Sequence, residues 1–380
     1  MPARPALSVD RPPNATSLST TARLVLALAL PLVLGSPGVA PAGDIFDGPR
    51  LDPRQPVERL AFGSCADQNR PQPIWNAVAS TQPQVFLFIG DNIYSDTVDM
   101  DRMAEDYETL AAVPEFAALR AKVPILATWD DHDYGANDAG AEYPKKAEAA
   151  ELLLNFFGEP PDSLRRQRPG IYDAQIYGPP GQRVQILLLD ARTFRSPLTQ
   201  DPSPLRRYRP NLDPAATMLG SAQWSWLAEQ LRRPAELRLI VSGVQVLGYA
   251  AGFESWKTLP LELERLYGVI RDAEADGVVF LSGDAHFTQL KRTDGGVGYP
   301  VYDFTSSGLT HSRPGSADRP SPLAIHRPYG GLNFGTITID WDREDPEIVL
   351  AARDRDASVV FEHRLRLSEL RAWREDMDRP

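Results

Sequence analysis

The segment that follows residues 123–128 concentrates groups that can bind a metal ion or move protons. Residues 123–128 are mostly apolar, as is typical of a short buried strand. Asp130, Asp131, His132 and Asp133 follow almost at once, so three carboxyl groups and one imidazole leave the end of that strand. Carboxylates crowded at a buried strand end are costly unless a cation or hydrogen bonds compensate them. The sequence therefore predicts a site for a hard or borderline metal ion, or alternatively a solvated acidic turn in which an Asp caps a short helix.

Five other apolar segments also lead into polar residues, and each is typical of a buried strand. These segments cover residues 57–65, 85–89, 184–189, 237–243 and 277–283. The polar residues that end or follow them are Cys65, Asp91 with Tyr94, Arg192, Gln245, and Asp284 with His286. Residues 135–138 extend the acidic segment with further oxygen donors. Because sites in α/β folds gather at the carboxyl ends of strands, we expect all these residues to form one site.

Several of these residues also have a purely structural interpretation. Cys65 is the only cysteine, so it cannot form a disulfide within the chain, and it is either a metal ligand or a small buried thiol. Arg192 follows a strand end, where a planar guanidinium can grip an oxyanion or pair with a nearby acid. Asp91 and Tyr94 either face one ligand together, or serve as a helix cap and a core residue. The residue types alone leave these alternatives open.

The composition is that of an ordinary globular protein. The chain has 380 residues, enough for a sizeable core, and its hydrophobic fraction of 42% is unremarkable for a globular protein. Its formal net charge of −11 argues against non-specific binding to nucleic acid or to anionic lipid. The 35 prolines fall mostly between the periodic segments, which predicts long stiffened loops such as residues 196–220.

Residues 1–42 have the pattern of a secretory signal peptide. Three arginines precede the apolar run 24–34, and residues 40–42 (Ala-Pro-Ala) provide small side chains for cleavage. The run is short and contains Pro31, so we expect no stable membrane span after processing; an uncleaved anchor is the alternative. We therefore expect an exported protein, periplasmic or extracellular, with a single domain over residues 43–380.

Hydrophobic periodicity predicts the elements that hold these strand ends in place. Helices are predicted over residues 99–120, 142–157, 221–231 and 260–275. Towards the end of the chain, apolar and polar residues alternate, which is typical of half-exposed antiparallel strands. His326 lies in a loop and His363 lies in this alternating region. We predict both histidines to be non-catalytic, because no acid-rich strand end accompanies them.

Four motifs together resemble the PhoD-like alkaline phosphatases, secreted members of the calcineurin-like metallophosphoesterase superfamily. The motifs are Gly63-Ser64-Cys65, Gly90-Asp91-x-x-Tyr94, Trp129-Asp130-Asp131-His132-Asp133 and Ser282-Gly283-Asp284-Ala285-His286. The resemblance runs from about residue 57 to about residue 370. It implies an α/β fold of four layers, αββα, with two facing mixed sheets flanked by helices. It also implies one ferric ion and calcium ions acting on small phosphate monoesters or diesters.

The resemblance also implies a role for each matching residue. The implied metal ligands are Cys65, Asp91, Tyr94, Asp131, Asp284 and His286. Among them, Asp91 would bridge the metals, and Cys65 and Tyr94 would bind the iron. His132 would contact the phosphate and protonate the leaving oxygen, and Arg192 would bind the phosphate. The resemblance assigns no role to Asp130, Asp133, Asn137 or His311.

The sequence departs from the superfamily pattern in two places. Gly63-Ser64-Cys65 replaces the Asp-x-His motif, and residues 241–245 match the Val-x-x-His motif without its histidine. The lost nitrogen ligands favour oxygen-binding ions such as calcium over zinc beside the iron. Two alternatives stay open: a phosphodiesterase or phospholipase that prefers diesters, and a non-catalytic envelope binding module on the same fold. The sequence identifies neither the physiological ester nor an oligomeric state.

Overall fold

The computed structural model describes residues 45–204, 206–248, 252–316 and 321–372. The predicted signal peptide, residues 1–42, lies outside the described residues. All the helices and strands that are described fall within the unit formed by residues 41–380. Within these ranges, none of the helices combines the length and the apolar character needed to cross a membrane.

The first sheet has six strands in the order β14-β13-β12-β1-β2-β3. The strands are β1 (Arg59–Gly63), β2 (Val85–Ile89), β3 (Ile125–Thr128), β12 (Asn333–Asp340), β13 (Glu347–Asp354) and β14 (Val359–Arg366). β1, β2 and β3 are parallel, so the residues that follow them emerge at the same edge. β12, β13 and β14 join β1 in antiparallel pairs, which confirms the prediction for the alternating C-terminal segments.

The second sheet also has six strands, in the order β10-β11-β9-β8-β5-β4. The strands are β4 (Asp173–Tyr177), β5 (Val184–Leu188), β8 (Leu237–Ser242), β9 (Val278–Ser282), β10 (Thr288–Thr293) and β11 (Val301–Ser306). β5, β8, β9 and β11 are parallel, and the antiparallel strands β4 and β10 form the two edges. The chain segments that follow these parallel strands therefore also emerge at one edge of the sheet.

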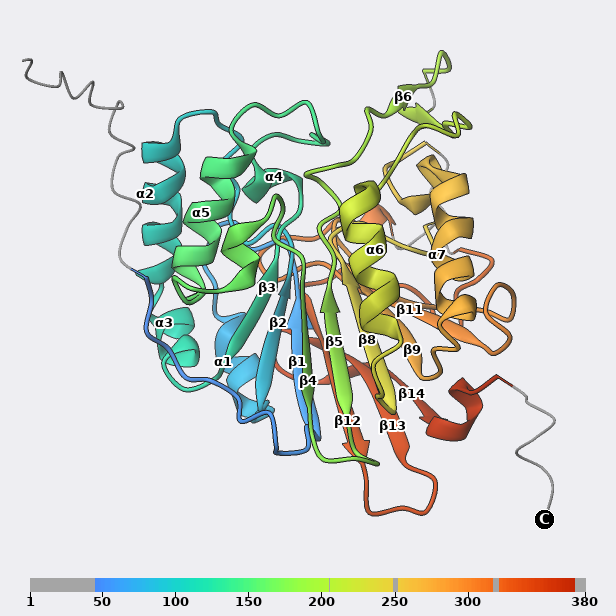
Figure 1. The fold of residues 1–380 in the computed structure, drawn as a ribbon. Helices are drawn as coiled ribbons and strands as arrows, with labels where there is room; N and C mark the ends of the chain where they lie inside the picture. The colour runs from blue at the N-terminus through green and yellow to red at the C-terminus, as the bar shows by residue number, and fades with distance from the viewer. Residues whose placement is uncertain (1–44, 205, 249–251, 317–320, 373–380) are drawn as a thin grey trace, which may run out of the picture. The chain divides into compact units, whose positions relative to one another are not determined.

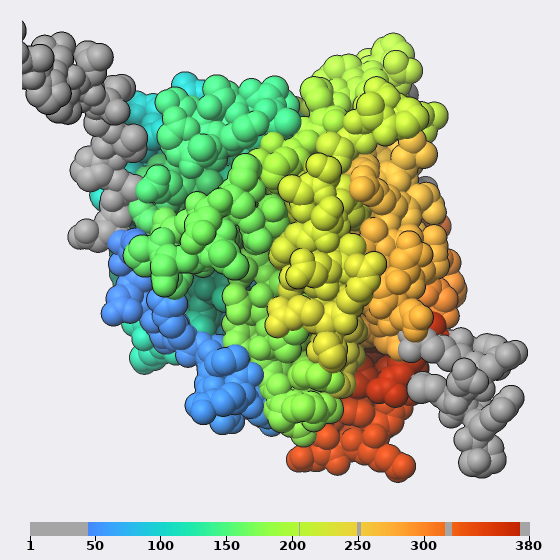
Figure 2. Space-filling model, viewed as in Figure 1, coloured from blue at the N-terminus to red at the C-terminus, as the bar shows by residue number. Residues whose placement is uncertain are grey.

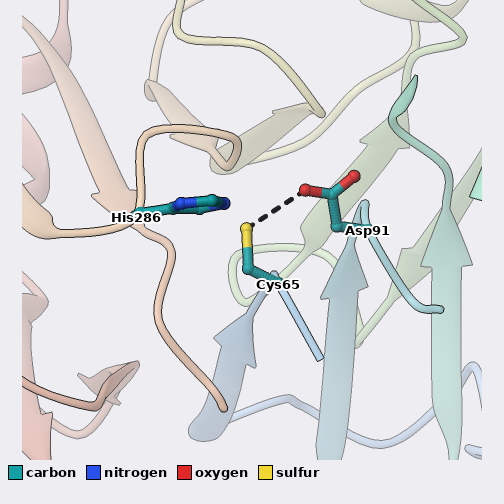
Figure 3. A group of neighbouring side chains, drawn as sticks. All are labelled: Cys65, Asp91 and His286. Atoms are coloured by element: carbon teal, nitrogen blue, oxygen red, sulfur yellow. Dashed lines mark hydrogen bonds between the residues drawn. The ribbon is translucent and has the colours of Figure 1, made fainter. Parts of the chain in front are cut away.

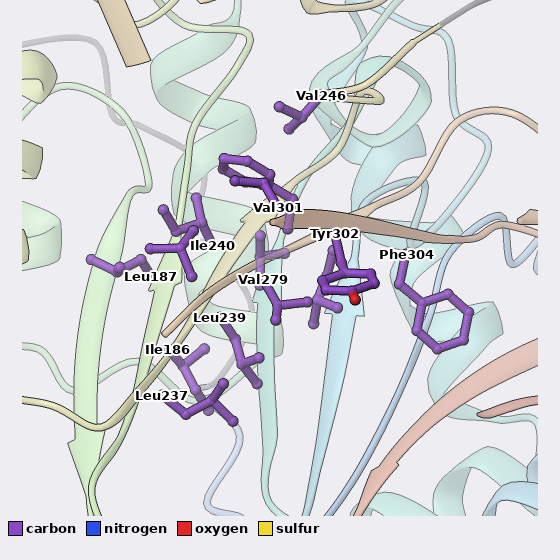
Figure 4. Packing of buried hydrophobic residues seen from close by; sticks show 14 of the residues in the cluster. Ile186, Leu187, Leu237, Leu239, Ile240, Val246, Val279, Val301, Tyr302 and Phe304 are labelled. Atoms are coloured by element: carbon purple, nitrogen blue, oxygen red, sulfur yellow. The ribbon is translucent and has the colours of Figure 1, made fainter. Parts of the chain in front are cut away.

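Helices cover the outer face of each sheet, which confirms the four-layer αββα arrangement (Figure 1). The helices on the first sheet are α1 (Ile74–Ser80), α2 (Met100–Ala111), α3 (Pro114–Arg120), α4 (Asp131–Tyr134) and α5 (Lys146–Phe156); those on the second are α6 (Gly220–Leu231) and α7 (Pro260–Asp272). Between the sheets, the rings of Phe62 and Phe304 meet with centroids 4.9 Å apart. Figure 4 shows the packing around Phe304 and Val279 in the second sheet. Strands β2, β5, β8 and β9 are buried along their whole length, which explains their continuous apolar sequences.

Two sequence expectations differ from the structure. The predicted helix over residues 99–120 is two helices, because Pro114 begins α3 and its ring disfavours helical backbone at the residue before it. The predicted loop over residues 196–220 contains a small hairpin of β6 (Thr199–Gln200) and β7 (Tyr208–Arg209). This segment, yellow-green in Figure 2, stands out at the upper right of the surface. Single 3-10 turns are η1 (Leu164–Gln167), η2 (Trp256–Thr258), η3 (Pro314–Ser316) and η4 (Leu367–Leu370).

Candidate active site

The carboxyl ends of β1, β2 and β3 lie at the same end of the sandwich as those of β5, β8 and β9 (Figure 1). Glycines let the two sheets approach closely there. A Cβ atom on Gly283, which follows β9, would lie 2.8 Å from both the carbonyl oxygen of Gly243 and the hydroxyl oxygen of Ser64. No side chain fits that space, so glycine at this position allows the ends of β1, β8 and β9 to meet.

Four of the predicted site residues have an unusual backbone conformation. The φ angles of Cys65, Asp91, Asp284 and His286 are 65°, 49°, 64° and 58°. This left-handed region is uncommon for residues other than glycine and costs on the order of 1–3 kcal/mol per residue. Backbone strain of this kind concentrates at functional sites, where the surrounding structure holds it in place.

Cys65, Asp91 and His286 form a first group of possible metal ligands (Figure 3). Their ligand atoms lie within 4.8 Å of one another. The thiol of Cys65 donates a hydrogen bond to Oδ2 of Asp91 at 3.2 Å. The Tyr94 hydroxyl donates to the same oxygen at 3.0 Å and lies 3.2 Å from Nε2 of His286. A thiol, a carboxylate, a phenol and an imidazole therefore converge on one point.

Asp91, Asp131 and His132 form a second group, which shares Asp91 with the first. His132 is fixed on several sides: Nδ1 lies 2.7 Å from Oδ2 of Asp96, and its ring packs on Tyr94 with centroids 4.2 Å apart. Its Nε2 lies 4.0 Å from Oδ1 of Asp131. Burial by itself lowers the pKa of His132, but the hydrogen bond with Asp96 and the charges of Asp91 and Asp131 outweigh it and raise the pKa to about 10.

Asp131, Asp138 and Glu254 form a third group, linked to the second by Asp131. The backbone N–H of Asp138 donates to Oδ2 of Asp131 at 2.7 Å. Guanidinium groups compensate the other two acids: Arg207 lies 2.8 Å from Asp138, and Arg195 lies 3.0 Å from Glu254. The third group is therefore a network of acids and arginines. Sequence reasoning missed Glu254, which lies in the irregular segment between β8 and η2 and follows no strand end.

The charges of the first two groups call for a cation. Burial, with the negative charges of neighbouring groups, raises the pKa of Asp91 and brings that of Asp284 to about 8. Burial also raises the pKa of the Cys65 thiol to about 11. Oδ1 of Asp131 and Nδ1 of His286 are buried, and no residue in the described ranges gives either a hydrogen-bond partner. The pKa of Asp131 shifts in the other direction. Burial by itself raises it, but the charges of Arg192 and His132 outweigh burial and lower the pKa to about 2. The destabilised anions of Asp91 and Cys65, with the unpartnered oxygen of Asp131, fit a bound metal ion.

Comparison with known proteins identifies the family. A family model described as PhoD-like phosphatase matches residues 60–324, well over half of the chain. The chain belongs to the PhoD-like phosphatase family. Alkaline phosphatase D of Bacillus subtilis (strain 168) is 24% identical over 188 residues, which cover 44% of this chain and 32% of that protein. The match thus spans about a third of the length of this curated relative. A solved structure described as "Structure of PhoD" has a TM-score of 0.66 at 16% identity, covering 85% of this chain and 73% of that chain, and supports the fold.

In this PhoD-like chain, the structure brings together six of the predicted site residues. They are Cys65, Asp91, Tyr94, Asp131, His132 and His286. Asp284 follows β9, and its side chain belongs to none of the three groups found among the described residues. Burial is the main cause of the raised pKa of Asp284, and the negative charge of Asp131 is the next largest. Asp284 therefore lies in the same electrostatic environment as Asp131.

The structure places Arg192 differently from the sequence expectation. Its side chain is fully buried, at 0% exposure. Nε lies 2.8 Å from Oδ1 of Asp130, and a terminal nitrogen lies 2.8 Å from Oε2 of Glu254 and 3.3 Å from the carbonyl oxygen of Ala139. Because its donors already face carboxylates, the geometry does not support a direct contact with phosphate. The arrangement matches the other interpretation of this residue, an ion pair with nearby acids.

Asp133 has a structural role in this geometry. Its Oδ1 accepts a hydrogen bond from the backbone N–H of Asp130 at 2.8 Å, and its Oδ2 accepts one from that of Asn92 at 3.2 Å. Asp133 therefore ties the start of α4 to the residue that follows Asp91. The acidic turn is buried and not solvated as the alternative expected, but the capping box of Asp130 and Asp133 confirms that an Asp caps the short helix.

The three histidines that were not predicted as site residues divide between two regions. His311, for which the resemblance gave no role, lies beside the first group, with ring centroids 4.8 Å from Tyr94 and 4.5 Å from His286. His326 and His363 pack near each other, with ring centroids 5.8 Å apart. Neither of the last two belongs to the three groups located in the described ranges.

Proposed function

We propose that this protein is an exported, metal-dependent phosphoesterase that hydrolyses phosphate monoesters, diesters or both. One observation carries the proposal: the groups of possible ligands overlap, with Asp91 shared by the first and second, at the carboxyl ends of the parallel strands. A carboxylate shared between two adjacent ligand groups suits a site for neighbouring metal ions. Membership of the PhoD-like phosphatase family points to the same chemistry.

Two kinds of donor support two kinds of metal ion. Cys65, Tyr94 and His286 offer sulfur, phenol and imidazole donors around Asp91, and we assign this position to iron. Asp131, with Asp284 nearby, offers oxygen donors, which suit calcium. When bound, such ions would supply Lewis-acid activation of water and of the phosphoryl group.

His132 is the residue we assign to the leaving group. Asp96 holds Nδ1, so the other ring nitrogen, Nε2, faces Asp131 and the second group. A proton on Nε2 can pass to the oxygen of a leaving alcohol placed there. Arg192 acts differently: its ion pairs with Asp130 and Glu254 hold the segment before Asp131, so it positions a ligand and does not touch the ester.

The pattern of residues 1–42 supports export, with cleavage after residue 42. This proposal is tested on secreted material: N-terminal sequencing of the exported protein should begin at residue 43. An N-terminus that retains the apolar run would favour the membrane anchor instead.

Elemental analysis together with two substrates tests the enzymatic proposal. The mature protein, purified without a histidine tag, should contain stoichiometric iron with calcium. It should hydrolyse p-nitrophenyl phosphate, bis-p-nitrophenyl phosphate or both, and the ratio of the two rates separates a monoesterase from a diesterase. A protein that remains inert after iron and calcium are added back would overturn the proposal and favour a binding module. Activity with a different metal content would overturn the iron and calcium assignment alone.

A further inference from the structure

The hairpin formed by β6 and β7 carries three exposed arginines close together in a chain of negative net charge. Arg206, Arg207 and Arg209 occupy three of four consecutive positions, and all three are exposed, in a protein whose formal net charge is −11. Tyr208, between them, is buried. In Figure 2 the yellow-green segment that contains the hairpin forms a projecting part of the surface. The hairpin therefore presents its guanidinium groups to solvent while one residue anchors it.

Hydrogen bonds connect this hairpin to the two segments that contain Asp138 and Glu254 of the third group. The Tyr208 hydroxyl donates to Oδ2 of Asp138 at 2.5 Å, and Arg207 lies 2.8 Å from the same oxygen. The backbone N–H groups of Arg207 and Tyr208 both donate to the carbonyl oxygen of Gly252 at 2.9 Å, two residues before Glu254. Arg207 and Tyr208 thus anchor the hairpin beside Asp138, a member of the third group, and the exposed Arg206 and Arg209 flank these two anchors in the sequence.

Some of the arginines in this region form no ion pair with the residues that the structure describes. Arg192 and Arg195 are buried and compensate Asp130 and Glu254. Arg207 contacts Asp138 and keeps 47% of its side chain exposed. For Arg206 and Arg209, no acidic partner is found within the described ranges. Planar guanidinium groups bind carboxylates and phosphates through paired hydrogen bonds, so these exposed arginines suit an anion from outside the chain.

We propose that the hairpin arginines form a second anion subsite, which binds a carboxylate or a second phosphate on the alcohol part of the ester. This inference rests on the proposed phosphoesterase function. A chain of contacts leads from His132 to the hairpin. His132, assigned to the leaving oxygen, adjoins Asp131, whose other oxygen accepts a hydrogen bond from Asp138. Arg207 in turn contacts Asp138. The leaving alcohol therefore extends from His132 towards the hairpin. Esters whose alcohol carries an additional negative charge are the favoured substrates.

Two esters that differ only in one charge test the subsite. The probes are 4-carboxyphenyl phosphate and its neutral isostere 4-carbamoylphenyl phosphate, with release of inorganic phosphate measured for each on the metal-loaded mature protein. The wild type should show a KM for the carboxylate ester about tenfold below that for the amide ester, as expected for two partly exposed charge-assisted contacts. In the double variant Arg206→Gln/Arg209→Gln this ratio should fall towards one. In Arg206→Glu/Arg209→Glu it should reverse.

The control is Arg355→Gln, which removes another exposed arginine, one in the turn between β13 and β14 and outside the three groups. It should keep the wild-type ratio. Equal KM values in the wild type, or a ratio that both double variants leave intact, would overturn the subsite while leaving phosphoesterase activity established. Failure to hydrolyse either monoester would overturn the subsite. Only an additional failure to hydrolyse bis-p-nitrophenyl phosphate would overturn the proposed function.

Discussion

Replacement of Arg192 by methionine separates the two roles considered for this residue. The side chain is 0% exposed, and its partners Asp130 and Glu254 are 0% and 1% exposed, so solvent screens neither ion pair. The substitution keeps most of the side-chain volume and leaves two buried carboxylates without their shared guanidinium. Loss of one partner from a buried ion pair typically costs about 3–5 kcal/mol. We therefore expect Arg192→Met to lower the free energy of unfolding by about that amount.

Urea unfolding, followed by tryptophan fluorescence on wild type and variant at the same metal content, measures this loss. Arg265→Met is the matched control, because Arg265 is 48% exposed and pairs with Glu262 at 3.4 Å. An ion pair of that kind contributes roughly 0–1 kcal/mol. If Arg192→Met unfolded within about 1 kcal/mol of the wild type and raised only the KM for phosphate esters, the positioning role would be refuted and a direct phosphate contact would take its place.

Three further substitutions test other parts of the structure. Asp91→Asn removes the carboxylate shared by the first two groups, and should abolish phosphate release and reduce metal content in the same preparation. Asp96→Asn removes the partner of His132 Nδ1 and should lower kcat roughly 10–100-fold, with little change in the metal content measured by elemental analysis. Lys291→Met removes a buried amine whose charged form opposes folding, because burial lowers the pKa of Lys291 from 10.5 to about 8, although the charge of Asp303 partly offsets this effect. Since that penalty is present below pH 8, urea unfolding should show the wild type gaining stability as the pH rises from 8 to 10.5, and the variant lacking this gain.

Much of the fold was predictable because its central strands are buried on both faces. The continuous apolar runs that became β2, β5, β8 and β9 can belong only to fully covered strands of this length, so their number and ends could be located in the sequence. The edge strand β4 was not predicted, since only one of its five residues is buried and no apolar run marks it. The edge strands β3 and β14 were nevertheless predicted, β3 from an apolar run and β14 from alternation, so a strand escapes prediction when its sequence shows neither pattern.

The same reasoning explains which site residues could be found. Cys65, Asp91, Asp131 and His286 each follow a predictable strand. Parallel pairing gathers the first three at one edge of the first sheet, and the packing of the two sheets brings His286, after β9, to the same end of the sandwich. Glu254 follows no strand, and its place in the site depends on contacts with residues about sixty positions away in the sequence. Such long-range pairing leaves no local pattern, so only the three-dimensional structure could reveal it.

Arg192 shows why an arginine at a strand end is difficult to assign from sequence. Its position is the one expected for a phosphate ligand, yet two buried acids lie within its reach. Asp130 and Glu254 lie outside the first two groups, and in the buried interior the guanidinium groups of Arg192 and Arg195 balance them. An arginine that neutralises buried carboxylates has no donor left for a substrate. The hairpin arginines Arg206 and Arg209 are exposed and have no acidic partner in the described part of the chain, so they are the guanidinium groups that we propose for substrate binding.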